Sequence, residues 1–193
     1  WDTVLKTAIS DLEVDQREVN SKLYHIRYPI ENREDFITIA TTRPETMLGD
    51  TAIAVNPSDK RHKKVVGKFV TIPLVGRKIK IIEDEYADPE QGTGAVKITP
   101  AHDFNDYEVG ERNNLEVINV FTEDGKINEN APKDFIGLDR FEARKRLLKK
   151  LKENNFFVKE ENIKNKVPYG DRSNSIIEPY LTEQWFADAK KLS

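Results

Sequence analysis

Residues 92–106 read G-T-G-A-V-K-I-T-P-A-H-D-F-N-D, which predicts a turn, a strand and the start of a helix in that order. Side chains alternate between the two faces of a strand. Lys97 and Thr99 should therefore share one face, and Val96 and Ile98 the other. A lysine beside Thr99 would be unusual in a core and ordinary on a face that meets water.

Further strands are predicted on both sides of this segment, because Ile- and Val-rich stretches of period two are separated by Gly, Pro and Asp. At least six short strands this close together favour a barrel or sandwich, since closure removes exposed edges. We predict a mainly β fold, a compact β-barrel over roughly residues 22–130 that is decorated by several α-helices. The strands are expected at residues 22–28, 35–42, 51–55, 69–75, 77–82, 94–99 and 116–121.

Two helices are predicted, at residues 103–113 and 139–154. In the second helix, Asp139 followed by Glu142 resembles a capping box. Its buried stripe should consist of Ala143, Leu147, Leu148 and Leu151. Its outer face is basic, and we interpret it as solvated rather than as an RNA contact; it carries Arg144, Lys145, Arg146, Lys149, Lys150 and Lys152.

The two ends of the chain are expected to be linker arms around one domain. Residues 1–20 are polar and weakly patterned, residues 167–193 mix apolar and turn residues, and the domain should span residues 21–166. The only Met is Met47, so the chain is interpreted as part of a larger protein. An inserted domain leaves and re-enters its parent through one gateway, so the arms should lie near each other.

Composition limits the classes of function that are possible. The chain of 193 residues is enough for one substantial domain, and 37% of its residues are hydrophobic. It has no cysteine, which excludes disulfides, thiolate zinc sites and cysteine nucleophiles and fits a cytoplasmic location. No apolar run is long enough for a membrane span, and the N-terminus is no signal peptide. The net charge of -3 argues against a bulk electrostatic hold on nucleic acid.

The segment T-T-R-P-E-T at residues 41–46 places hydroxyl groups at the end of a strong strand. Pro44 suits the first turn of a helix, with a threonine as its cap. Free backbone N–H groups would then gather beside these hydroxyls. Helix capping alone explains the pattern as well as a ligand site does.

Asp103 and Asp106 are three residues apart, which makes them neighbours on one helical face. The helix dipole should keep both carboxylates ionised at neutral pH, and such a pair suits an ammonium group, although dipole compensation alone also explains it. His102 could join them as a metal ligand, but His25 and His62 have no ligand spacing to them, so we predict no metal. The residues alone therefore predict a polar pocket for an ammonium compound.

Two long segments resemble the editing (proofreading) domain of valyl-tRNA synthetases, a class I aminoacyl-tRNA synthetase family. They are T-T-R-P-E-T-M-L-G-D-T-A-I-A-V-N-P from Thr41 and G-T-G-A-V-K-I-T-P-A-H-D-F-N-D-Y-E-V-G from Gly92. Supporting matches include P-L-V-G-R-K-I, V-P-Y-G-D-R and both arms, so the likeness covers nearly the whole chain. The H-I-G-H and K-M-S-K-S type motifs of the ATP-using catalytic domain are absent, so we expect no activation of valine by this chain.

Related synthetases carry the same module, and the sequence distinguishes among them. Isoleucine enzymes resemble T-T-T-P-W-T, where this chain has Arg43 and Glu45 at the variable places. Leucine enzymes resemble A-V-P-G-H-D, where this chain has K-I-T-P-A-H from Lys97. Both differences favour valine. An isoleucyl-type editing domain and a non-catalytic tRNA-docking module remain as alternatives.

The resemblance implies a post-transfer editing hydrolase that deacylates threonine mischarged on valine tRNA, without cofactor or metal. Its partners would be the 3′ terminal adenosine end of that tRNA and the rest of the parent synthetase, and the isolated domain is expected to be monomeric. Asp106 would hold the α-ammonium group of the amino acid. The threonine hydroxyl would be read by Lys97, Thr99 and Asp103. The adenosine and the attacking water would be positioned by Thr41, Thr42, Arg43 and Thr46, of which Thr41 and Thr42 are assigned to catalysis together with Asp106.

Overall fold

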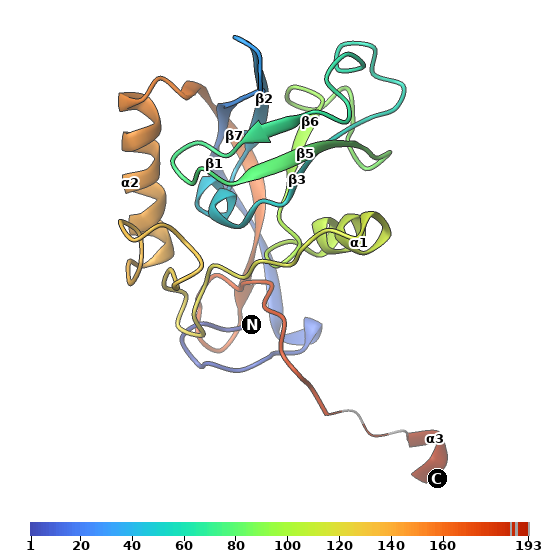
Figure 1. Cartoon of the computed structure of the whole chain (residues 1–193). Coiled ribbons are helices and arrows are strands. Elements are labelled where there is room, and N and C mark those ends of the chain that lie inside the picture. The colour runs from blue at the N-terminus through green and yellow to red at the C-terminus, as the bar shows by residue number, and fades with distance from the viewer. Residues whose placement is uncertain (186, 188, 193) are drawn as a thin grey trace.

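The computed structural model describes residues 1–185, 187 and 189–192. Figure 1 shows a body of strands with α2 on one side and α1 on another, and a long ribbon that runs from the body toward the N-terminus. In chain order the elements are η1 (Asp11–Glu13), β1 (Val14–Pro29), β2 (Phe36–Thr41), η2 (Pro44–Gly49), β3 (Ala52–Val55), β4 (Phe69–Thr71), β5 (Lys78–Glu83), β6 (Ala95–Ile98), α1 (Phe104–Asn113), α2 (Arg140–Glu153), β7 (Phe157–Gly170) and α3 (Ala189–Leu192).

The strands form two open sheets, with the order β2-β1-β7 in one and β4-β5-β3-β6 in the other. β3 and β5 are parallel, and the other pairs are antiparallel. Within the described residues neither sheet closes, so the prediction of a barrel is wrong, although the fold is mainly β as expected. The sheets meet through the isolated bridge between Ile30 and Val70, and β2 packs against β6 without a hydrogen-bonded ladder. Alternation along a strand reveals its faces but not its pairing partners.

One hydrophobic core holds the two sheets and α2 together. It contains buried side chains from both sheets, such as Ile26 and Ile53, and Leu147 from α2. A smaller cluster packs Val109 of α1 against Ile98 of β6. The second sheet is therefore covered on both faces, and the start of α1 lies beside the end of β6.

The predicted strands before residue 100 all exist, but residues 116–121 are not a strand. Within that segment, several backbone groups are satisfied by side chains, and one backbone bond joins Asn128 N to Val120 O over 2.9 Å. The N–H of Val120 donates to His102 Nε2 over 3.0 Å, and the Asn128 amide donates to the carbonyl oxygens of Asn119 and Phe121. The apolar alternation there reflects the packing of an irregular segment. Its one β-bridge joins Phe121 to Ile127.

Both predicted helices are confirmed, and their details differ slightly. The Asp139 carboxylate accepts from Phe141 N over 2.8 Å, as an N-cap should, but Glu142 pairs with Lys145 rather than closing a capping box. The stripe of α2 is buried at Ala143, Leu147 and Leu151, whereas Leu148 is only partly buried.

The N-terminal arm and the first part of the C-terminal arm, up to about Tyr180, lie side by side, as expected for an inserted domain. Trp1 N donates to Glu178 O over 2.9 Å, and Glu178 N donates to Trp1 O over 3.0 Å. β1 pairs with β7, beginning with Val14 opposite Gly170. β1 therefore continues across the expected domain limit at residue 20, and β7 across the limit at residue 166. β7 was not predicted, because most of its side chains are exposed and polar and leave little apolar alternation. None of the helices in the described part of the chain is long and apolar enough to cross a bilayer.

Candidate functional site

A cavity of about 530 Å³ lies where the end of β2, the turn η2, the strand β6 and the start of α1 meet. Its volume is in the range of small-molecule sites. All the residues that the sequence singled out line it, and the structure leaves none of them elsewhere: Thr41, Thr42, Arg43, Thr46, Lys97, Thr99, Asp103 and Asp106. Their assigned roles remain predictions, but they share one place.

The hydroxyl-rich turn forms because β2 ends at Thr41 and η2 begins at Pro44. The expected threonine cap is wrong, since the N-cap is Arg43 and makes no side-chain capping bond. The threonines bind the turn in another way. Thr41 Oγ1 accepts from Arg43 N over 3.1 Å, and Thr46 Oγ1 donates to Arg43 O over 3.0 Å. Both hydroxyls fix the backbone of Arg43, while the Arg43 side chain extends along the cavity.

Asp50 lies behind the cavity and was missed by the sequence analysis. Its carboxylate is fully buried and accepts from Tyr28 Oη over 2.8 Å and from Thr99 Oγ1 over 2.6 Å. Lys97 Nζ lies 3.4 Å from the same carboxylate and also donates to Thr99 Oγ1. The hydroxyl proton of Thr99 is thus committed to Asp50. Toward a ligand, the Thr99 oxygen can only accept a hydrogen bond.

Lys97 and Thr99 share a face of β6, as predicted, and that face is buried rather than solvated. Lys97 is 7% exposed, and Asp50 is the counter-charge that makes this burial possible. Burial raises the pKa of Asp50, although Lys97 opposes the shift. The antiparallel pairing of Ala52 with Ile98 brings residue 50 beside Thr99. That pairing is the signal that would have revealed Asp50, and a sequence alone does not contain it.

Asp106 is buried, with 5% of its surface exposed, and Oδ2 accepts from Thr99 N over 2.8 Å. Burial raises its pKa to about 7, with Lys97 acting in the opposite direction. The expectation that this carboxylate stays ionised at neutral pH is therefore wrong, because desolvation outweighs the helix dipole. An ammonium group that entered the cavity would supply the missing counter-charge.

Asp103 stands at the exposed rim of the cavity and is the N-cap of α1. Its Oδ1 accepts from Asn105 N over 2.9 Å and from Asp106 N over 3.3 Å. This cap fixes the first turn of α1 and, with it, the backbone that carries Asp106.

His102 is buried between the cavity and the irregular segment that follows α1. Its Nε2 accepts from Val120 N, and burial together with Arg43 and Lys97 lowers its pKa well below 6.5. The ring is therefore neutral and carries its proton on Nδ1, a buried donor without a partner among the described residues. No group of three His, Cys, Asp or Glu side chains in the described part of the chain could hold a metal ion.

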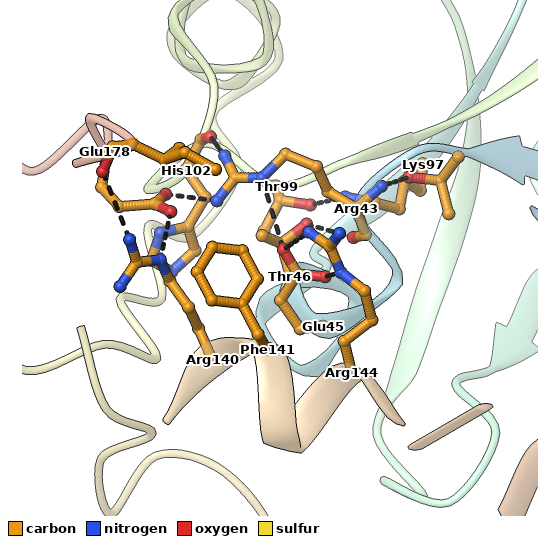
Figure 2. A network of polar contacts seen from close by, with 12 residues as sticks. Arg43, Glu45, Thr46, Lys97, Thr99, His102, Arg140, Phe141, Arg144 and Glu178 are labelled. Carbon is orange, nitrogen blue, oxygen red and sulfur yellow. Dashed lines mark hydrogen bonds and ion pairs between the residues drawn. The ribbon is translucent and has the colours of Figure 1, made fainter. Parts of the chain in front are cut away.

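An alternating row of charged side chains reaches the cavity at Arg43, and Figure 2 shows this row. We call it the ion-pair row; its members are Arg144, Glu45, Arg43, Glu178 and Arg140. Arg144 binds both oxygens of Glu45, over 2.6 and 2.7 Å. Arg144 was expected on the solvated face of its helix, and that is wrong: it turns inward to Glu45, which is 1% exposed. Burial would raise the pKa of Glu45, but Arg144 and Arg43 outweigh burial and lower it.

Comparison with known proteins connects the chain to aminoacyl-tRNA synthetases. A family model described as the editing domain of leucyl-tRNA synthetase matches residues 58–139. The valine–tRNA ligase of Pelagibacter ubique (strain HTCC1062) is 84% identical over 193 residues, which are 100% of this chain and 22% of that protein. The valine–tRNA ligase of Geobacillus stearothermophilus is 55% identical over the same length, with the same coverage. The chain thus spans about a fifth of the length of these relatives.

Two solved structures share the fold. One is the ternary LeuRS–tRNA–LeuAMS complex of Agrobacterium radiobacter K84, with a TM-score of 0.56, 21% identity, and coverage of 78% of this chain and 20% of that one. The other is GlLeuRS-CP1, with a TM-score of 0.56, 15% identity, and coverage of 71% and 98%. The chain belongs to the family of editing domains of class I aminoacyl-tRNA synthetases. Within that family it is of the valyl-tRNA synthetase type.

Proposed function

We propose that the chain is a post-transfer editing hydrolase, which cleaves the ester between threonine and the 3′ terminal adenosine of valine tRNA. One observation carries the proposal. A single cavity contains the buried carboxylate Asp106 beside the buried pair Lys97 and Thr99. Threonine would supply an ammonium group to the carboxylate of Asp106 and a hydroxyl group to Lys97 and Thr99. Valine would supply only the ammonium group.

Asp106 is assigned to the α-ammonium group of the threonyl ester. The carboxylate is partly protonated at neutral pH because its charge is buried. An arriving ammonium group would stabilise the charged form, so binding and ionisation should be coupled. A charge-assisted hydrogen bond in a desolvated site is stronger than a neutral one. Asp106 would thereby place the ester carbonyl at a fixed depth in the cavity.

Lys97 and Thr99 are assigned to the threonine hydroxyl. Thr99 can only accept and Lys97 can only donate, so a hydroxyl, which does both, fits between them. Valine would place a methyl group there and leave a buried polar group unpaired, at a cost of about 1–3 kcal/mol. A hydrophobic synthetic pocket rejects an added hydroxyl only weakly, a limit for which the valyl enzyme is itself the standard example. A second pocket that requires the hydroxyl resolves this problem.

Hydrolysis is assigned to a positioned water molecule, with no covalent intermediate. Water adds to the ester carbonyl carbon, the bond to the ribose oxygen breaks, and threonine and tRNA are released. An activated ester needs mainly positioning and stabilisation of the carbonyl oxygen. We assign the terminal adenosine and this water to four residues that line the same cavity, Thr41, Thr42, Arg43 and Thr46. We further propose that the domain is a monomer and works in the cytoplasm as part of a longer synthetase, joined to it through its two arms, residues 1–20 and 167–193.

The test is deacylation of valine tRNA charged with threonine or with valine, by this chain alone. We expect the threonyl ester to be hydrolysed about ten to several thousand times faster than the valyl ester, from one or two unpaired groups. Faster hydrolysis of the valyl ester would indicate an isoleucyl-type specificity instead. Failure to hydrolyse either ester, with tRNA binding retained, would indicate a docking module.

A further inference from the structure

We propose that Glu178, on the C-terminal arm, is a positioning residue for Arg43, and that pairing of the two arms thereby helps to assemble the cavity. This inference rests on the proposed deacylation, because only that function assigns Arg43 to the terminal adenosine. Its basis is the ion-pair row, in which Arg43 lies between Glu45 and Glu178 (Figure 2).

Every nitrogen of the Arg43 guanidinium group has a partner in the protein. Nε lies 3.4 Å from Glu45, Nη1 donates to His102 O over 3.1 Å, and Nη2 donates to Glu178. The planar guanidinium holds its donors in a fixed fork, so partners on opposite sides set both its place and its plane. The Arg43 side chain is 29% exposed and lines the cavity, so this orientation is presented directly to a ligand.

Glu178 is the only carboxylate that the described structure places between Arg43 and Arg140. Its side chain is 3% exposed, with Oε2 on Arg43 and Oε1 at 2.9 Å from Arg140 Nε. The row holds three cations and two anions, so loss of Glu178 would leave two neighbouring arginines with no shared anion. Breaking a buried pair by removing one partner leaves an uncompensated charge. Arg43 would then keep only the long contact with Glu45 and the bond to His102 O, and its guanidinium plane would be less firmly held.

The two carboxylates of the row differ in what holds them. Glu45 is bound by Arg144 of α2 and sits within the body of the domain. The Glu178 carboxylate also meets α2, through Arg140, but its backbone belongs to the C-terminal arm and pairs in both directions with Trp1 of the other arm. The geometry of Arg43 therefore depends on the body at one side and on the paired arms at the other. The arms are also the segments through which the domain is proposed to join its parent.

The first test replaces Glu178 with glutamine, which keeps the shape and removes the charge. The rate of threonyl-tRNA deacylation is measured to separate kcat from KM. We expect kcat to fall about 10- to 100-fold, the range that a small misplacement of a positioning group produces, because Arg43 is also assigned to the attacking water; KM should rise by a smaller factor, because Arg43 also holds the adenosine. Glu183→Gln, an exposed carboxylate on the same arm, is the matched control and should leave both constants unchanged. A Glu178→Gln variant with wild-type kcat overturns the proposal.

The second test asks whether Glu178 acts through Arg43. Arg43→Lys and the double variant Arg43→Lys with Glu178→Gln are compared with each single variant. If Glu178 works by holding Arg43, the double variant should be within about twofold of Arg43→Lys alone. Losses of kcat that multiply in the double variant would show that Glu178 acts elsewhere, and would overturn the proposal. If Glu178→Gln fails to fold, Glu178→Asp takes its place, since it keeps the charge and shortens the reach.

A third measurement needs no substrate. NMR of arginine-labelled protein reports rotation of the Arg43 guanidinium group, which should be slow in the natural chain and fast in Glu178→Gln. If the natural chain lacks deacylase activity but Arg43 is released in the variant, the proposed function fails and the positioning role stands. If the natural chain hydrolyses threonyl-tRNA but Arg43 moves equally in both proteins, the positioning role fails and the function stands.

Discussion

The backbone N–H of Thr99 donates to Oδ2 of Asp106 over 2.8 Å, which joins the end of β6 to the first turn of α1. The same two residues face one cavity, where one is assigned to the hydroxyl and the other to the ammonium group of a single amino acid. A hydrogen bond between them fixes the distance between those two recognition points. Threonine carries its hydroxyl and its ammonium group on adjacent carbons, so such a fixed distance suits it.

The first prediction concerns the pH dependence of deacylation. Because burial raises the pKa of Asp106 to about 7, kcat/KM for the threonyl ester should rise as pH increases through that value. It should fall again near about pH 8, where an α-amino group loses its proton. The measurement is kcat/KM from about pH 5.5 to 9, corrected for spontaneous hydrolysis of the ester. A profile that is flat between about pH 6 and 8 would remove Asp106 from ammonium binding.

The second prediction is that Asp106→Asn abolishes deacylation and stabilises the fold. An acid whose folded pKa of about 7 exceeds its ordinary 3.8 binds more protons folded than unfolded, so stability is present at low pH and lost as pH rises toward 7. Asparagine removes that cost and can still accept from Thr99 N. The gain in unfolding free energy at pH 8 should be a few kcal/mol and at most about 4 kcal/mol.

Denaturant unfolding at about pH 4 and 8 measures this gain, which should be absent at the lower pH. Glu108→Gln, an exposed change on the same helix, is the control and should alter neither stability nor activity. A variant that is less stable than the natural chain at both pH values would show that ionised Asp106 is satisfied within the protein.

The third prediction concerns metal and tRNA. The proposed chemistry needs no metal, so deacylation should survive dialysis against a chelator, and loss of activity that zinc restores would contradict it.

The net charge is -3, and four lysines of α2 lie beside carboxylates: Lys145, Lys149, Lys150 and Lys152. The isolated chain should therefore bind tRNA weakly. Binding isotherms at two salt concentrations test this, and tight, salt-insensitive binding would reveal a contact surface beyond the cavity.

Local sequence pattern was enough to place the residues of the cavity but not to describe their state. Period two correctly put Lys97 and Thr99 on one face, and the position of Asp106 in the first turn of a helix was correct. Burial depends on what packs against a segment, so the ionisation of Asp106 was predicted wrongly. Contacts across the chain were missed for the same reason: Arg43 and Glu178 are 135 residues apart, and nothing local to either one indicates the other.

The barrel was wrong because strand pairing is also a long-range property. The edge strands β2 and β6 of the two sheets pack against each other, but they form no hydrogen-bonded ladder within the described residues. A count of short strands favours closure on general grounds, but these edges are covered by packing instead. The open junction between β2 and β6 is where the cavity lies, since Thr41 ends one strand and Lys97 lies in the other. The junction of β2 and β6, which the fold prediction missed, therefore forms part of the candidate site.

The last prediction concerns specificity, and its quantity is the ratio of threonyl to valyl ester hydrolysis. Lys97→Met keeps the length of the side chain and removes the donor that would pair with the threonine hydroxyl. The threonyl rate should then fall while the valyl rate changes little, so the ratio should drop by about tenfold or more, as one lost hydrogen bond in a buried site implies.

Lys97→Met needs a control for stability, and Asp103 needs a test of its own. Lys97→Met also removes the cation beside Asp50, which costs stability, so Ile98→Val on the opposite face of β6 is the comparison: it weakens the core and does not line the cavity. At the rim, Asp103→Asn keeps the helix cap and removes the charge, whereas alanine would also lose the cap at about 1 kcal/mol. If Asp103 reads the hydroxyl, its asparagine variant should lower the ratio as well. Equal slowing of both esters in Lys97→Met and in Asp103→Asn would assign these residues to ester chemistry or to the fold, and the hydroxyl would have to be read by the oxygen of Thr99 alone.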